Sequence, residues 1–128
     1  MKKSKLVFAI LVAFVAISSC KKGEDDVVAP QITLISPMEG ASQSVSDSIA
    51  IEFIVDDEDL HEFTVEILKI NEGGSLSTFT QKGHSHERNY RYTNKVRQTS
   101  TGNYTLEIVA EDHNSNLTKS ATGFSLVE

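Results

Sequence analysis

The stretch of sequence that decides the fold reads Gly102-Asn103-Tyr104-Thr105-Leu106-Glu107-Ile108-Val109-Ala110-Glu111-Asp112. Apolar or aromatic side chains stand at every second position from Tyr104 to Ala110, and most positions between them are polar. Successive side chains of a β-strand point to opposite faces, so this order predicts a strand with one buried face. No stretch after Pro30 keeps helical spacing for three turns, which predicts an all-β domain.

Six further segments have strand-type composition or alternation, and turn-forming residues separate them. They are residues 31–35, 49–55, 63–70, 76–80, 88–96 and 117–127. Asn71-Glu72-Gly73-Gly74-Ser75 supplies turn chemistry between two of them and predicts a hairpin. Seven strands at this spacing predict a β-sandwich, with an up-and-down barrel as the alternative.

The stretch 102–112 resembles the sixth strand of immunoglobulin-like and cadherin-like modules on bacterial surfaces. This resemblance implies a tyrosine corner at Tyr104, with its ring in the core and its hydroxyl bonded to nearby backbone. The Cys and Trp hallmarks of antibody domains are missing, because the chain has one cysteine and no tryptophan. We therefore expect an immunoglobulin-like β-sandwich of about seven strands over residues 30–128, outside the antibody family.

The first 20 residues have the order of a secretory signal. Three lysines precede an apolar run over residues 6–17, and Ser18-Ser19-Cys20 follows. A transmembrane helix is the alternative, but the run is shorter than the ~20 residues that a ~30 Å hydrocarbon core requires. The end of the run resembles the lipobox of bacterial lipoproteins, which implies that residues 1–19 are cleaved and that Cys20 is acylated, for example with palmitate.

Residues 20–29 would then be an acylated cysteine with a charged tether, Lys21-Lys22-Gly23-Glu24-Asp25-Asp26 being free of apolar side chains. This segment resembles the surface-export signal of lipoproteins in one Gram-negative group, and a solvated linker is the alternative. We expect an outer-membrane lipoprotein at the cell surface, or otherwise at the periplasmic face, held to the membrane by its N-terminal lipid.

Composition excludes one class of partner. The chain has 12 Lys and Arg against 18 Asp and Glu, and loss of the three leader lysines leaves nine basic residues and a net charge of about −9. Nucleic-acid surfaces need clustered Lys and Arg, so no nucleic acid is expected. Acylation of the only cysteine leaves no disulfide, and the fold must depend on its apolar core.

Polar residues gather in the three loops that an immunoglobulin-like sandwich places at one end, namely those after the second, fourth and sixth predicted strands. These loops hold all four histidines and read Asp56-Asp57-Glu58-Asp59-Leu60-His61, Lys82-Gly83-His84-Ser85-His86-Glu87 and Asp112-His113-Asn114-Ser115-Asn116. Turn formation and solvation explain the same residue types without any ligand.

Zinc or copper suits the histidines, because both metals prefer imidazole nitrogen. Extended backbone would point His84 and His86 to one side. His61 or His113 would complete the set of ligands, with a carboxylate from Asp56, Asp57 or Asp112. Calcium, which takes six to eight oxygens, is the less favoured cation. Its candidates are Asp56, Asp57, Asp59, Glu111, Asp112 and Asn114, at spacings that depart from an EF-hand.

Residues 30–127 also resemble a family of small, uncharacterised bacterial immunoglobulin-like lipoproteins. The resemblance lies in the acidic loop 56–59, the element Gly83-His84-Ser85-His86, and Gly102-x-Tyr104 leading to Asp112-x-Asn114. It implies fold, location and a recurring His-x-His element, and no activity. Ser115 stands where such modules usually have glycine.

No enzyme is expected, because no nucleophile elbow exists and Ser85 is too close in sequence to its two histidines to form a triad. A binding or interaction module fits better, with a metal ion, an outer-membrane protein or a glycan as its ligand. Tyr90 and Tyr92 are the candidates for stacking sugars, but packing of both rings in the core is the favoured interpretation. A purely structural role remains open, as does O-glycosylation at Ser48, since Asp47-Ser48-Ile49 resembles a short bacterial acceptor sequence.

Overall fold

The computed structural model describes residues 27–128, which form eight strands. They are β1 (Gln31–Ser36), β2 (Ala41–Ser44), β3 (Ile49–Asp56), β4 (Leu60–Asn71), β5 (Gly74–His84), β6 (Asn89–Val96), β7 (Gly102–Asp112) and β8 (Leu117–Val127). The described part of the chain contains no helix long and apolar enough to cross a membrane. The expected signal peptide, Cys20 and residues 21–26 of the tether lie outside the described residues.

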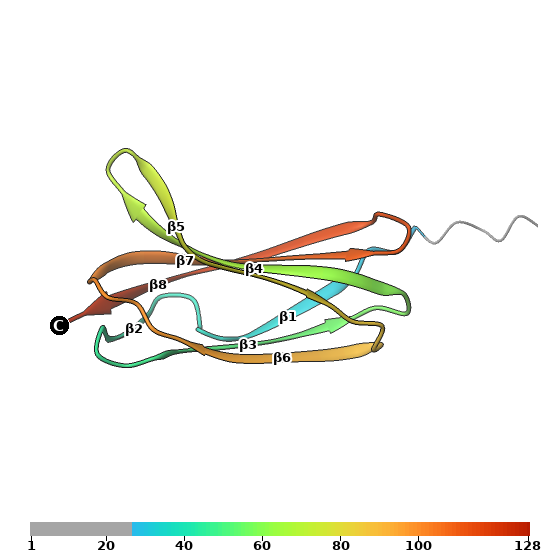
Figure 1. Cartoon of the computed structure of the whole chain (residues 1–128), viewed down its shortest axis with the longest axis horizontal. Helices are drawn as coiled ribbons and strands as arrows, with labels where there is room; N and C mark the ends of the chain where they lie inside the picture. Colours follow the sequence, from blue (N-terminus) through green and yellow to red (C-terminus); the bar gives the residue numbers. More distant parts are fainter. Residues whose placement is uncertain (1–26) are drawn as a thin grey trace, which may run out of the picture.

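Two sheets form the sandwich, and Figure 1 shows them as two layers. The smaller sheet has the order β1-β3-β6, and the larger one has the order β2-β8-β7-β4-β5. All neighbouring strands are antiparallel except β2 and β8. The all-β, immunoglobulin-like sandwich expected from the sequence is confirmed.

The core lies between the sheets and is built from alternate residues of the strands, as the sequence pattern predicts. On β7, Tyr104, Leu106, Ile108 and Ala110 are all buried, and β3 buries its own alternate positions against them. Each fully buried large side chain contributes roughly 1.5–3 kcal/mol relative to exposure. The sandwich therefore has a substantial apolar core of its own.

Tyr104 forms the expected tyrosine corner. Its ring is 1% exposed, and its hydroxyl donates a hydrogen bond to the backbone oxygen of Ser100 at 2.6 Å. Satisfying the hydroxyl in this way allows the ring to stay in the core, where it stacks on Phe124.

Two features of the strands differ from the expectations. β2 was not expected, because this serine-rich segment has no apolar alternation and its place depends on parallel pairing with β8. β4 and β5 extend beyond their predicted ends, so His61 lies within β4 and His84 ends β5 rather than lying in loops. Both extensions are held by pairing between β4 and its neighbours, which the local sequence does not encode.

Tyr90 and Tyr92 pack inward, which confirms core packing, the interpretation favoured over a sugar-stacking surface. Tyr92 is 5% exposed and stacks on Phe53 at 4.8 Å between ring centroids. Tyr90 lies against Phe63 at 5.0 Å. The glycan alternative thereby loses the residues proposed for it.

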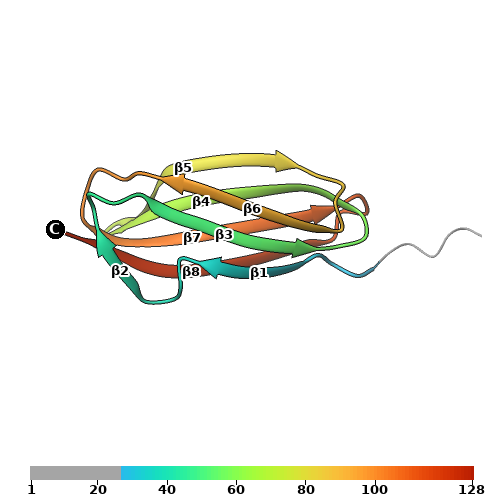
Figure 2. The same ribbon diagram turned by 90° about the horizontal axis from the view of Figure 1, so that it is seen from below.

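The connections β3–β4, β5–β6 and β7–β8 lie at one end of the sandwich, together with the start of β1 (Figures 1 and 2). The C-terminus lies at the opposite end. Three segments that are far apart in sequence thus meet, as the alternation of strand direction predicts.

Candidate functional site

All four histidine rings meet at this end and form a closed ring of contacts. His61 lies 4.5 Å from His113 and 4.8 Å from His84, measured between ring centroids. His86 closes the circle at 4.5 Å from His84 and 5.0 Å from His113. We call these four residues the histidine cluster.

The spacing of His84 and His86 places both rings on one side of extended backbone. Their Nε2 atoms are 2.9 Å apart, a hydrogen bond in which one imidazole donates and the other accepts. Ser85 between them is buried, and its N–H donates to the backbone oxygen of His61 at 3.3 Å. This bond ties the two histidines to the strand that carries His61.

His113 is oriented by Asp59. Its Nδ1 lies 3.0 Å from the backbone oxygen of Asp59 and 3.1 Å from the carboxylate Oδ1. A carbonyl oxygen can only accept, so Nδ1 carries the proton and the lone pair of the neutral ring is on Nε2. The backbone N–H of His113 donates to the same carbonyl at 3.1 Å.

The sequence expectations placed Asp59 only among calcium ligands and missed it as a partner of histidine. It precedes His61 by two residues, so the signal was its place in the loop that meets the β7–β8 turn. A carboxylate on the far nitrogen of an imidazole fixes the tautomer and raises the basicity of the other nitrogen.

His61 contributes an unusual atom. Its Nδ1 is buried and has no hydrogen-bond partner in the described part of the chain. Buried polar atoms are almost always paired, so an unpaired one in a cluster of imidazoles requires a functional or structural reason.

The pKa of His84 is lowered from its ordinary value of 6.5. Desolvation is the largest cause, followed by the neighbouring imidazoles of His86, His61 and His113, while Glu62 opposes them. The surroundings of His84 therefore favour its neutral imidazole, the form that binds metal ions.

The rings nevertheless contact one another rather than a common point. Within residues 27–128, no group of three or more His, Cys, Asp or Glu side chains is arranged to hold a metal ion. Two imidazole nitrogens bound to one tetrahedral zinc ion would lie about 3.3 Å apart, given bonds of about 2.0–2.1 Å. His84 and His86 are a few tenths of an ångström closer than that, so binding of an ion would break their hydrogen bond and move the two nitrogens apart.

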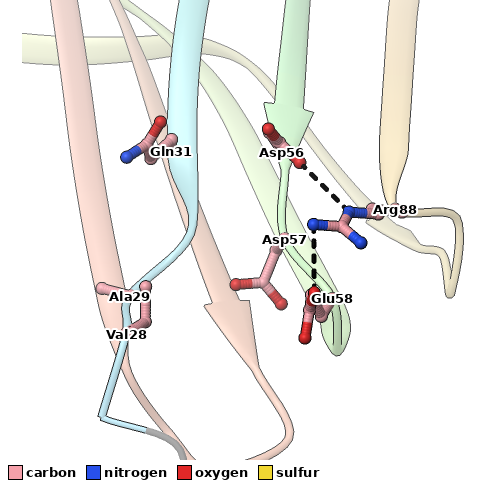
Figure 3. A pocket seen from close by; sticks show the side chains of 7 residues that line it. All are labelled: Val28, Ala29, Gln31, Asp56, Asp57, Glu58 and Arg88. Atoms are coloured by element: carbon pink, nitrogen blue, oxygen red, sulfur yellow. Dashed lines mark ion pairs between the residues drawn. The ribbon is translucent and has the colours of Figure 1, made fainter.

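Asp56 and Asp57, predicted as ligands beside the histidines, have other partners. Figure 3 shows them in a cleft of about 320 Å³, where the guanidinium of Arg88 lies between Asp56 and Glu58. Arg88 is 3.0 Å from the Glu58 carboxylate and 4.0 Å from that of Asp56. Asp57 is buried and accepts a hydrogen bond from the N–H of Asp59 at 2.7 Å.

Asp112, the third predicted carboxylate ligand, stabilises its own turn. Its Oδ1 accepts hydrogen bonds from the N–H groups of Asn114 and Asn116, each at 2.8 Å, and its Oδ2 accepts one from the Asn116 side chain at 2.7 Å. Burial acts to raise the pKa of Asp112, but these hydrogen bonds outweigh it and the pKa is lowered. The carboxylate is thus engaged as an anion within the β7–β8 turn.

The glycine of the Gly83-His84-Ser85-His86 element has a packing role. A Cβ atom added to Gly83 would lie 2.1 Å from the ring carbon Cζ of Phe63. Phe63 is buried beside Tyr90 and Tyr92, so the ring has little room to move. Glycine is therefore needed here for close approach rather than for backbone freedom.

Comparison with known proteins finds structural likenesses among solved structures. A solved structure of murine CRIg matches with a TM-score of 0.48 and 16% sequence identity, over 75% of this chain and 96% of that chain. No protein-family model matches the chain, and no curated protein matches it.

Proposed function

We propose that this chain is an exported, lipid-anchored binding module that holds a transition metal ion, zinc or copper, at the histidine cluster. The observation that carries the proposal is the closed ring of four imidazoles, with neighbouring centroids 4.5–5.0 Å apart. His61 and His84 lie on β4 and β5, and His86 and His113 lie in the connections after β5 and β7. Imidazole nitrogen is a preferred ligand of both metals.

The donor atoms follow from the hydrogen bonds. His113 would bind through Nε2, because its Nδ1 faces Asp59. His84 and His86 would bind through the two Nε2 atoms that already face each other. The unpaired Nδ1 of His61 shows that this ring also has a nitrogen without a protein partner.

Binding is favoured over catalysis as the role of the site. His84, His86 and His113 are exposed, and His61 is half-buried. Metal-assisted hydrolysis would need a cleft that encloses substrate beside an open coordination position. An exposed cluster at the tip of a sandwich suits an ion or a protein partner better.

The proposed anchor brings the cluster close to the membrane. β1 begins at the end of the sandwich that carries the cluster, and Gln31 pairs with Asp56 beside the β3–β4 connection. Residues 21–29 span at most ~30 Å at ~3.3 Å per residue. The cluster would therefore face lipid headgroups or a neighbouring outer-membrane protein.

Metal content of the intact protein tests the proposal. The full chain, purified without a polyhistidine tag and offered zinc or copper, should retain one ion per chain by elemental analysis. A His84→Ala, His86→Ala double variant should lose it, and Glu87→Gln, which changes an exposed neighbour, should keep it. If the parent protein binds neither ion at micromolar concentration, the metal proposal is refuted. A structural or glycan-binding role would then be the alternative.

The anchor has a separate test. Cells labelled with a palmitate analogue should yield labelled protein from the parent gene and none from Cys20→Ser. Labelling of the variant, or none of the parent, would contradict lipidation at Cys20 without bearing on the metal.

A further inference from the structure

The solvent exposure of the histidine cluster affects the residence time of a bound metal ion. Structural zinc sites are closed, with four protein ligands shielded from solvent, whereas sites that exchange a ligand keep an open position. Three of the four histidines here are exposed. Water, or a ligand from another protein, could therefore reach a bound ion.

Backbone hydrogen bonds join the connections at the end of the sandwich that carries the cluster. The N–H of Asp57 donates to the backbone oxygen of Arg88 at 2.9 Å, which joins the β3–β4 and β5–β6 connections. The N–H of His113 donates to Asp59 and so joins the β3–β4 and β7–β8 connections. Asp112 adds three hydrogen bonds inside the last turn.

The cluster also stands on a continuous apolar core. Leu60 and Phe63, on either side of His61, are at most 2% exposed and belong to the continuous apolar core. Small metal-dependent domains such as zinc fingers differ, because the free energy of metal binding is their free energy of folding. Residues 27–128 contain no cysteine, so thiolate ligands are absent from the described site.

We infer that the histidine cluster is a site for an exchangeable transition-metal ion, which loads and leaves while the sandwich stays folded. This inference rests on the proposed function and adds that the ion is cargo rather than a structural part. The acceptor or donor would be a group with nitrogen or sulfur ligands that reaches the exposed face of the cluster.

Release of the ion from the loaded full chain tests the inference. The chain is loaded with zinc and mixed with excess EDTA, and the free ion and the circular dichroism are followed together. We expect complete loss of the ion within seconds, with near- and far-ultraviolet spectra unchanged. Release over hours, or release accompanied by loss of either spectrum, would overturn the inference while leaving metal binding intact.

The other outcomes separate the two proposals. A chain that never retains zinc or copper refutes the proposed function and the inference with it. Asp112→Ala is the control for a loosened β7–β8 turn. It removes hydrogen bonds near His113 but leaves all four imidazoles in place. If the parent protein releases zinc no faster than a closed structural site does, exposure of the histidines does not set the rate of zinc release. The inference then fails.

Discussion

Ser115 lies in the left-handed region of backbone space, with φ of 65° in the turn between β7 and β8. A residue with a Cβ atom pays roughly 1–2 kcal/mol to adopt this conformation, whereas glycine does not. Ser115→Gly should therefore stabilise the protein by about 1 kcal/mol in urea unfolding, after allowance for the larger entropy of unfolded glycine.

The matched control is Ser48→Gly, at an exposed residue outside the left-handed region. This change should be neutral or destabilise by up to about 1 kcal/mol, because only the unfolded-state entropy acts. Equal effects of the two substitutions would show that the turn is not strained at Ser115.

Asp59 is a positioning residue for the proposed metal site, because it orients His113 without being placed to bind the ion. Asp59→Asn keeps the size of the side chain and the backbone acceptor but removes the charge facing Nδ1. Loss of such an outer partner typically costs 10–100-fold in metal affinity, and we expect about 10-fold here because the backbone acceptor remains.

Isothermal titration with zinc measures this effect, and Glu58→Gln is the control. Glu58 is the adjacent acidic residue and faces Arg88 rather than a histidine. Its variant has the same net charge as Asp59→Asn, so a general loss of charge would weaken both equally. Only a selective effect of Asp59→Asn supports a role through His113.

At the scale of elements, Gly83 lets the ring of Phe63 lie against the backbone of β5 next to His84. Gly83→Ala should destabilise the protein by about 2–3 kcal/mol, because the new methyl group overlaps a buried aromatic ring. Gly73→Ala is the control, since a Cβ atom there meets nothing within 4 Å. Denaturant unfolding of both variants measures the difference, and a cost below that of the control would contradict the packing role.

The sequence predicts the elements that have a buried face and misses those that depend on pairing. The alternation on β3 and β7 is strong because each packs one face into the core. β2 has no such pattern, and most of the residues added to β4 and β5 are polar or glycine, so their strand conformation depends on the neighbouring strand. Local sequence therefore underestimates strand length where a hairpin extends beyond the core.

The same distinction applies to the site. That the four histidines meet could be predicted from the sequence. Alternating strand direction brings the three connections and the adjoining strand ends to one end of the sandwich, and this does not depend on side-chain contacts. The partners of the carboxylates could not, since Arg88 competes for Asp56 and backbone N–H groups compete for Asp57 and Asp112. Only three-dimensional packing decides which acceptor each donor meets.

At the scale of the whole molecule, the two ends of the sandwich have different chemistry. The histidine cluster, the Arg88 cleft and the start of β1 share one end, and the C-terminus lies at the other. The tyrosine corner and the continuous core join the two sheets between them. A rigid sandwich of this kind would hold the cluster at a fixed distance from wherever its first strand is attached.

Titration of His84 should make both the stability and the metal affinity of the whole domain depend on pH. The pKa of His84 is lowered in the folded protein, so below 6.5 the unfolded chain binds more protons than the folded one. This contribution to stability is fully present above 6.5 and is lost as pH falls from 6.5 to the folded-state pKa. Urea unfolding of the metal-free chain between about pH 7.5 and 5.5 should therefore show a fall in stability that His84→Asn reduces.

Protons should compete with the ion over the same range. Each imidazole must be neutral to bind, and each proton displaced lowers the apparent affinity for zinc by up to about 10-fold per pH unit below its pKa. In zinc titrations at several pH values, the apparent affinity should thus fall more steeply with each pH unit toward acid. His84→Asn should weaken zinc binding and make its affinity depend less on pH. A pH profile that is the same in parent and variant would mean that His84 does not titrate with the cluster, because removing a coupled imidazole must change the number of protons released.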